Sequence, residues 1–141
     1  MSQGILISDA VSLAMHSMAV MASRDGLSSA KDVAGRLGVS EHHLAKVLQR
    51  LARCGLVRST RGPRGGFTLA KKSGAITLLD VYEAIEGPLK ERACLMRKKT
   101  CNKKRCILGD SMGTMWDIFR KHLKSTYISD ISEAYRVEAP R

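Results

Sequence analysis

Three cysteines in a short, strongly basic stretch are the residues of this sequence best suited to chemistry. Cys94, Cys101 and Cys106 lie within thirteen residues and have lysines and arginines as neighbours. Nearby cations stabilise the thiolate, which is the form of cysteine that binds metals and reacts with oxidants. An odd number of thiols argues against a disulfide framework, and three thiols are one short of a complete tetrahedral metal site.

Several uses of these thiols can be compared from residue types alone. Structural zinc sites usually contain C-x2-C pairs, whereas the spacing here is C-x6-C-x4-C. A thiol–disulfide switch suits the cationic surroundings. An inert loop suits them poorly, because exposed reactive cysteines are generally avoided. An iron–sulfur cluster fits best, since soft thiolates would hold an anionic cluster whose charge the nearby cations offset. Zinc and a thiol switch remain alternatives.

The basic residues of the chain gather in two segments. The 141 residues carry a formal net charge of +11. Residues 31–72 contain ten Lys or Arg and two acidic residues, and residues 89–106 contain eight Lys or Arg and one acidic residue. Such segments are typical of proteins that bind a polyanion, most often nucleic acid. They disfavour an acidic, ferredoxin-like electron carrier. The four histidines belong to no hydrolase or transferase motif, so we expect no enzyme.

The N-terminus and the hydropathy pattern predict a cytoplasmic protein. No apolar run reaches about 18 residues, so we expect no membrane span. The first residues, MSQGILISDA, lack the basic and apolar regions of a secretory leader. A reducing cytoplasm would keep the thiols free, which again favours metal or redox chemistry over disulfides.

Periodicity and turn residues predict a mainly α-helical fold with one small β-hairpin. A helical pattern of apolar residues follows Ser8, and Ser29 and Ser40 stand where N-caps of two further helices are expected, with Gly38 between those helices. Two β-rich runs come next, LVRST and FTLA, joined by the turn RGPRGG. Two short helices followed by a hairpin are typical of a winged helix-turn-helix, which binds DNA.

Helices are predicted on both sides of the cysteine segment. Thr77 and Asp80 have capping-box spacing at the start of one helix, and Gly87 ends it. Beyond the cysteines, apolar residues from Met112 to Leu123 mark one face of a long helix, which we expect to pair with its copy in a homodimer. The predicted parts are a DNA-binding domain at 1–87, a cysteine-rich cluster-binding loop at 88–110, and a dimerisation helix with a tail at 111–141.

The start of the second motif helix and the wing carry the candidate DNA-binding residues. Side chains at the tip of a recognition helix face base edges, whereas flanking cations and a wing contact phosphates or the minor groove. Glycines let a hairpin approach a groove closely. A dimer would place two such helices one DNA turn apart on a palindromic operator. The predicted contacts are Ser40, His42, His43, Lys46, Arg50, Arg58, Arg61, Gly62, Arg64 and Gly65.

Three motifs make the chain similar to a known family. They are S-x-x-x-L at Ser40–Leu44, GLVRSTRGPRGG and ITLLDVYEAIEG. With these motifs, residues from about 7 to 131 resemble the Rrf-type winged-helix transcriptional regulators, and the basic three-cysteine segment resembles their cluster-binding branch. The resemblance implies a repressor with one iron–sulfur cluster per subunit, 4Fe-4S in preference to 2Fe-2S. It also implies that nitric oxide, an oxidant or iron–sulfur status controls operator binding.

The resemblance also bears on a fourth cluster ligand. In one group of members a histidine follows the third cysteine by three positions, but here that position is Gly109. The nitric-oxide-sensing members use instead an aspartate near the start of the first helix, donated by the partner subunit. Asp9 matches that position and is the predicted fourth ligand, with His16 and Asp110 as alternatives.

The fourth cysteine, Cys54, is distant in sequence from the other three. Free cysteine is among the residue types most often buried, so we expect Cys54 to be a small apolar core residue at the end of the recognition helix. Hydrophobic residues make up 44% of the chain but aromatic residues only 4%, which predicts an aliphatic, methionine-rich core.

Overall fold

The structure is a computed structural model that describes residues 7–90, 94, 96, 100–102 and 104–136. The described part contains six α-helices and one two-stranded sheet, which confirms the predicted mainly α-helical fold with a small hairpin. No helix in these ranges is both long enough and apolar enough to cross a membrane. In chain order the elements are α1 (Asp9–Ala22), α2 (Ala30–Leu37), α3 (Glu41–Arg53), β1 (Val57–Thr60), β2 (Gly66–Leu69), the 3-10 helix η1 (Ser73–Ala75), α4 (Leu78–Glu86), α5 (Ser111–Ser125), α6 (Ile128–Ser132) and the 3-10 helix η2 (Glu133–Tyr135).

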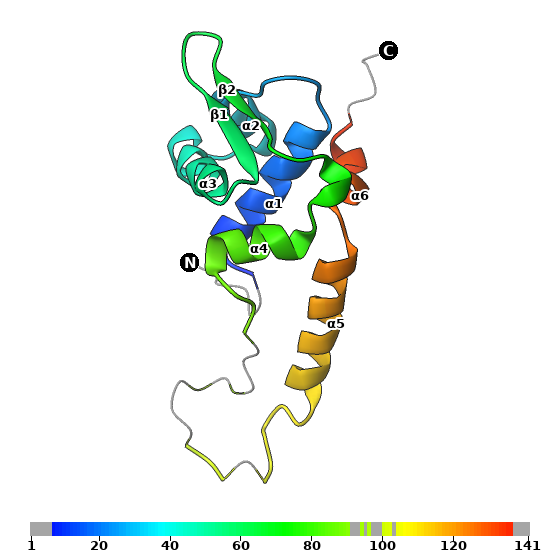
Figure 1. Ribbon diagram of the computed structural model, residues 1–141. Helices are drawn as coiled ribbons and strands as arrows, with labels where there is room; N and C mark the ends of the chain where they lie inside the picture. Colours follow the sequence, from blue (N-terminus) through cyan, green and yellow to red (C-terminus); the bar gives the residue numbers. More distant parts are fainter. Residues whose placement is uncertain (1–6, 91–93, 95, 97–99, 103, 137–141) are drawn as a thin grey trace.

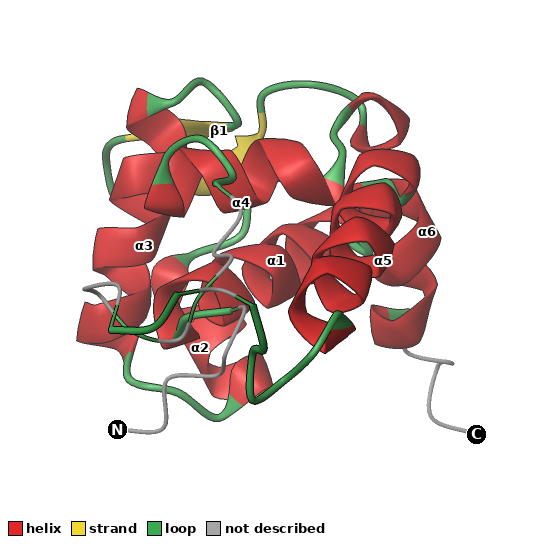
Figure 2. Cartoon of the chain, turned by 90° about the horizontal axis from the view of Figure 1, so that it is seen from below, coloured by secondary structure: helices red, strands yellow, loops and turns green. Residues whose placement is uncertain are grey.

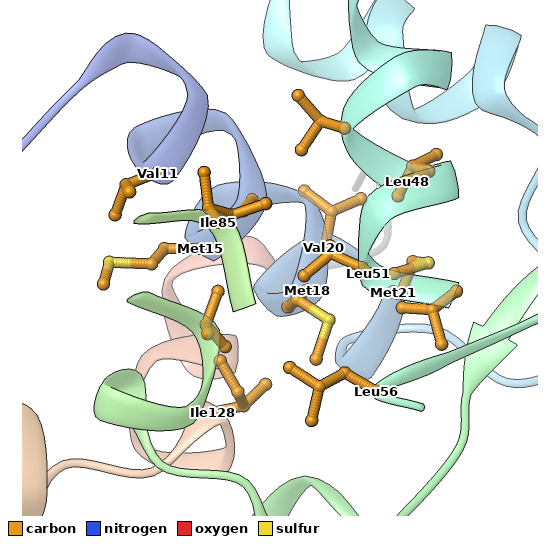
Figure 3. Close-up of a cluster of buried hydrophobic side chains, with 14 of the residues drawn as sticks. Val11, Met15, Met18, Val20, Met21, Leu48, Leu51, Leu56, Ile85 and Ile128 are labelled. Atoms are coloured by element: carbon orange, nitrogen blue, oxygen red, sulfur yellow. The ribbon is translucent and has the colours of Figure 1, made fainter. Parts of the chain in front are cut away.

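Helix α1 lies at the centre of the molecule (Figures 1 and 2). It packs against α2, α3, α4, α6, β2 and η2. Figure 3 shows Met18 and Val20 of α1 beside Leu48 and Leu51 of α3, and Ile85 of α4 closes the same cluster. Burying each such side chain stabilises the fold by about 1.5–3 kcal/mol. The core is therefore aliphatic and rich in methionine, as predicted.

The first four α-helices begin at the residues predicted from the sequence. In each case a side-chain oxygen accepts a hydrogen bond from a backbone N–H of the first turn, which satisfies a donor that the helix leaves free. Thr77 and Asp80 form a full capping box, with hydrogen bonds of 2.9 and 3.1 Å. Gly38 has a φ of +67° at the end of α2, and this left-handed residue turns the chain into α3. The N-cap residues are Ser8, Ser29, Ser40 and Thr77.

The hairpin is attached to the helices through its second strand. Strands β1 and β2 pair antiparallel, from Val57 opposite Leu69 to Thr60 opposite Gly66. Phe67 of β2 exchanges two backbone hydrogen bonds with Ser28, in the loop before α2, at 2.8 and 2.9 Å. The wing is thereby held against the helix-turn-helix rather than connected to it only by the chain.

The C-terminal part of the chain leaves the body and then returns to it. Helix α5 packs against α4 and extends beyond it, whereas α6 and η2 fold back onto α1 (Figure 1). The sequence pattern indicated only a tail after α5, because α6 has a single turn. Its formation depends on tertiary contacts: Ile128 is fully buried, and a β-bridge joins Tyr127 to Thr77.

Candidate nucleic-acid interface and cysteine segment

The start of α3 presents polar side chains on the surface. Ser40, His42, His43 and Lys46 are all exposed, whereas Leu44 on the same helix is fully buried. This division follows from helical periodicity, since the apolar face packs on α1 and the opposite face is left to solvent. The residues predicted to read base edges are therefore accessible.

The wing adds three exposed arginines beside that helix. Arg58 lies on β1, and Arg61 and Arg64 lie in the connection between the strands. No carboxylate among the described residues forms an ion pair with any of them. Their charge is therefore available to a polyanion.

Two of the predicted wing glycines are required by the backbone. Gly62 has a φ of +111°, a conformation that residues with a side chain rarely adopt. Gly65 donates a 2.9 Å hydrogen bond to the carbonyl of Gly62, and a Cβ at position 65 would lie 2.2 Å from the carbonyl oxygen of Thr60. Only glycine fits this tight turn, which brings Arg61 and Arg64 to the tip of the wing.

Arg50, another predicted DNA contact, has a partner inside the protein. Its guanidinium donates a 2.5 Å hydrogen bond to the backbone carbonyl of Ile85, in the last turn of α4. It lies more than two helical turns beyond the tip of α3. The sequence does not indicate such a bond, because every residue has a backbone carbonyl that could accept it.

The prediction that Cys54 belongs to the core is wrong. Cys54 is the C-cap residue of α3, and it is exposed. It lies one residue beyond the end of the helix, past Leu51, the last side chain that α3 turns toward α1. Its thiol donates a 3.5 Å hydrogen bond to the carbonyl of Ala84, so it contacts α4 next to Arg50.

The three clustered cysteines are free and exposed. Of the described residues from 94 to 110, only Leu108 is partly buried. Asp9 is also exposed, in the first turn of α1, and no described residue bonds its carboxylate. Within the described part of the chain, no three His, Cys, Asp or Glu side chains come close enough to hold a metal ion. The donor types suit an iron–sulfur cluster, but one chain in this conformation does not gather them.

The two alternative fourth ligands differ in their surroundings. His16 Nδ1 lies 2.6 Å from the backbone oxygen of Ser12, and its ring packs edge-on against Tyr135 with centroids 6.2 Å apart. Asp110 occupies the N-cap position of α5, where its side chain makes no capping bond. Its carboxylate is exposed, like that of Asp9.

One contact near Asp9 was not predicted from the sequence. The hydroxyl of Ser8, which caps α1, donates to the carboxylate of Glu86 at the end of α4. The two residues are 78 positions apart, so no local pattern could pair them.

Comparisons with known proteins agree with this architecture. The family described as "Rrf2: Iron-dependent Transcriptional regulator" matches residues 7–134. A protein of Aquifex aeolicus, provisionally named an HTH-type transcriptional regulator, is 31% identical over 131 residues, which cover 90% of this chain and 91% of that protein. The HTH-type transcriptional regulator IscR of Yersinia pseudotuberculosis is 30% identical over 112 residues, covering 79% of this chain and 65% of that protein.

A solved structure shows the same fold. The structure of CymR, described as the global cysteine regulator of B. subtilis, superimposes with a TM-score of 0.76 and 25% identity, covering 93% of this chain and 98% of that one. The family match spans nearly all of the described residues and confirms the resemblance found in the sequence motifs. This protein is therefore a winged-helix, DNA-binding transcriptional regulator that belongs to the Rrf2 family.

Proposed function

We propose that this protein is a homodimeric repressor whose affinity for a palindromic operator is controlled by an iron–sulfur cluster. The observation that carries the proposal is one chain with two separate basic regions. One is the surface formed by the tip of α3 and the wing, and the other contains three free, exposed thiols between α4 and α5. In Figure 1 the wing lies at the top and the coloured residues before α5 lie at the bottom, with α3 at the level of α1 between them. A DNA-binding surface and a sensing segment can therefore act at the same time.

Two sets of residues would bind the operator. His42, His43 and Lys46 would enter the major groove, where imidazole and ammonium groups donate to base acceptors. The Arg61 and Arg64 side chains at the wing tip would follow phosphates or a narrow minor groove. Replacing both arginines with alanine should weaken binding to all DNA sequences, and the salt slope of log K should fall by about 2.

A dimer would form through α5. Met115 is 38% exposed and Ile118 is 66% exposed on this helix, although both side chains are apolar. Burying such residues against a second copy removes apolar surface from water and produces a two-fold symmetric assembly. Two α3 helices could then read the two halves of one operator.

The cluster ligands would be Cys94, Cys101 and Cys106, with the partner subunit's Asp9 as the fourth. The carboxylate of Asp9, which no described residue bonds, supports this assignment over His16, whose ring already contacts Ser12 and Tyr135. When bound, the cluster would supply an iron that nitric oxide or an oxidant can attack. The segment and Asp9 would hold the two subunits in the geometry that binds DNA, and loss of this bridge would release the operator.

The test is anaerobic purification, followed by an absorbance spectrum and iron and sulfide analysis. A broad visible band with about four irons per chain supports a 4Fe-4S cluster. Asp9→Ala should lower cluster retention and operator affinity while leaving the dimer intact. Asp110→Ala, which removes an equally exposed carboxylate, is the matched control and should retain the cluster. Equal cluster content in Asp9→Ala and the unmodified protein would exclude Asp9 as a ligand.

A cluster-free regulator is the second candidate. All three thiols in the segment are exposed and unpaired, so they could form a disulfide or bind zinc. A colourless protein that still binds the operator, and that loses binding on oxidation or zinc removal, would favour this candidate. DNA recognition by α3 and the wing is the same in both proposals.

A further inference from the structure

The last turn of α4 connects regions that are far apart in sequence. We call residues 83–86 the α4 junction. Glu83 bonds to the start of the cysteine segment, Ala84 and Ile85 bond to α3, and Glu86 bonds to the start of α1. Four consecutive residues thus hold three separate parts of the molecule. Figure 1 shows this end of α4 below α3 and beside the start of α1.

The bonds to α3 use backbone acceptors of α4. Arg50 donates to the carbonyl of Ile85 at 2.5 Å, and Cys54 donates to that of Ala84 at 3.5 Å. The last turn of a helix has carbonyls without partners and a partial negative charge, and a cation stabilises it. Helix α4 has no basic residue in its own last turn. Arg50 supplies that cation from the recognition helix.

The other bonds of the junction reach two segments that carry proposed cluster ligands. One is the cysteine segment of the same subunit, and the other is the start of α1, whose Asp9 would bind the cluster of the partner subunit. The carboxylate of Glu83 accepts a 3.1 Å hydrogen bond from the backbone N–H of Leu89, where the chain leaves α4 for the cysteines. The carboxylate of Glu86 accepts from the hydroxyl of Ser8, which immediately precedes Asp9. A change in the position of either attachment therefore acts on the same helical turn that holds Arg50.

We propose that the α4 junction couples the cysteine segment and the start of α1 to the recognition helix, with Arg50 as the positioning residue. This inference rests on the proposed function. It assigns Arg50 a role distinct from the phosphate contact that its position in a basic helix predicts. Cluster binding would fix the position of the last turn of α4. Because Arg50 is hydrogen-bonded to the carbonyl of Ile85, α3 would move together with that turn.

A small tilt of α3 around Arg50 would displace the tip of this helix far enough to affect DNA binding. Glu41 at the tip of α3 and Arg50 are separated by roughly 14 Å along the helix axis at the standard rise per residue. Tilting α3 by about 10° around Arg50 would move the tip by roughly 2 Å. Hydrogen bonds to base edges tolerate only a few tenths of an ångström. A small displacement of the α4 junction would therefore decide whether the tip of α3 can bind the operator.

The experiment compares operator affinity for cluster-loaded and cluster-free protein in five matched forms. These are the unmodified chain, Arg50→Ala, Arg50→Lys, Glu86→Ala and Arg53→Ala. Arg53 lies on the same helix and carries the same charge, but no described residue bonds its side chain. Glu86 is exposed at the end of α4 and lies outside the core, so its variant tests the junction even if Arg50→Ala folds poorly. Hydrogen exchange of the α3 amides, measured on the same samples, gives a readout independent of DNA.

We expect the cluster to raise the operator affinity of the unmodified protein by about 10-fold or more, within the usual range for coupled sites. In Arg50→Ala and Glu86→Ala this ratio should approach one, and the cluster should no longer protect the α3 amides. Arg50→Lys should restore part of the ratio, because an ammonium can still donate to the Ile85 carbonyl. Arg53→Ala should lower both affinities equally and leave the ratio unchanged.

The possible failures are distinguishable. If the cluster-loaded and cluster-free forms of the unmodified protein bind the operator with nearly equal affinity, cluster control is overturned, and so is the coupling. If the unmodified protein shows the expected ratio of affinities and both Arg50→Ala and Glu86→Ala keep that ratio, only the coupling is overturned. An equal loss of the ratio in Arg53→Ala also overturns it, because the effect would then come from charge on α3 rather than from the junction.

Discussion

From Ser8 to Glu86 each α-helix begins at a hydrogen-bonded cap and buries a face against its neighbours, whereas from Cys94 to Asp110 nearly every described side chain is exposed. We call the first region the body, and the second region belongs to the cysteine segment, residues 88–110. Helix α5, which follows the cysteine segment, has no side-chain cap, unlike the first four α-helices. The body thus specifies its own conformation through packing and caps. The described side chains of the cysteine segment are exposed instead of packed, so they contribute little to the stability of the fold.

The largest effect is expected from a cavity in the body. Leu48 is fully buried, and Leu48→Ala should lower the free energy of unfolding by about 2–5 kcal/mol, through lost transfer energy and an unfilled cavity. Ile107→Ala, at a residue that is 91% exposed beside Cys106, is the control and should change it by less than about 0.5 kcal/mol. Denaturant unfolding of the cluster-free protein measures both. Similar losses in the two variants would mean that the cysteine segment is packed like the body.

An intermediate effect is expected from the turn of the wing. Gly65→Ala would place a Cβ 2.2 Å from the Thr60 carbonyl oxygen, so the turn must open. We expect a loss of about 1–3 kcal/mol of stability together with weaker operator binding. Gly35→Ala in α2 is the matched control, since nothing lies within 4 Å of a Cβ there. It should stabilise the fold by about 0.5–1 kcal/mol. A harmless Gly65→Ala would contradict the geometry of this turn.

The smallest effect on stability is expected in the cysteine segment. Cys101 is exposed and unpaired, so Cys101→Ser should change the free energy of unfolding of the cluster-free protein by less than about 0.5 kcal/mol. The same variant should lose most of its iron when purified anaerobically. Cys54→Ser removes another exposed thiol and should keep its iron. A large loss of stability in cluster-free Cys101→Ser would break the distinction between the two regions.

Much of the body could be predicted because its signals are local. Caps at Ser8, Ser40 and Thr77, the left-handed Gly38 and the hairpin sequence each act within a few residues of the chain. The helical pattern of apolar residues after Ser8 likewise predicted α1, although this central helix is buried on more sides than one face. These signals were enough to predict a winged helix-turn-helix and to place the tip of α3 and the wing on the surface.

The errors and omissions all concern contacts between distant segments. Cys54 was expected in the core from its residue type, but the end of α3 places it on the surface against α4. Helix α6 was missed because its single turn depends on burial of Ile128. The bond from Arg50 to the Ile85 carbonyl could not be predicted from the sequence. Every residue carries the same backbone carbonyl, and only the packing of α3 on α4 selects the one at Ile85.

The sequence by itself determined helices α1 to α5 and the hairpin, the exposed residues at the tip of α3 and on the wing, and the three thiols with their cationic neighbours. The reason is that caps, periodicity, turn residues and charge act over a few positions along the chain. Only the tertiary structure decided which segments meet at the end of α4, since Ser8, Arg50 and Leu89 are brought there by the packing of α1, α3 and α4. A link between the cysteine segment and the recognition helix exists only once that packing has formed.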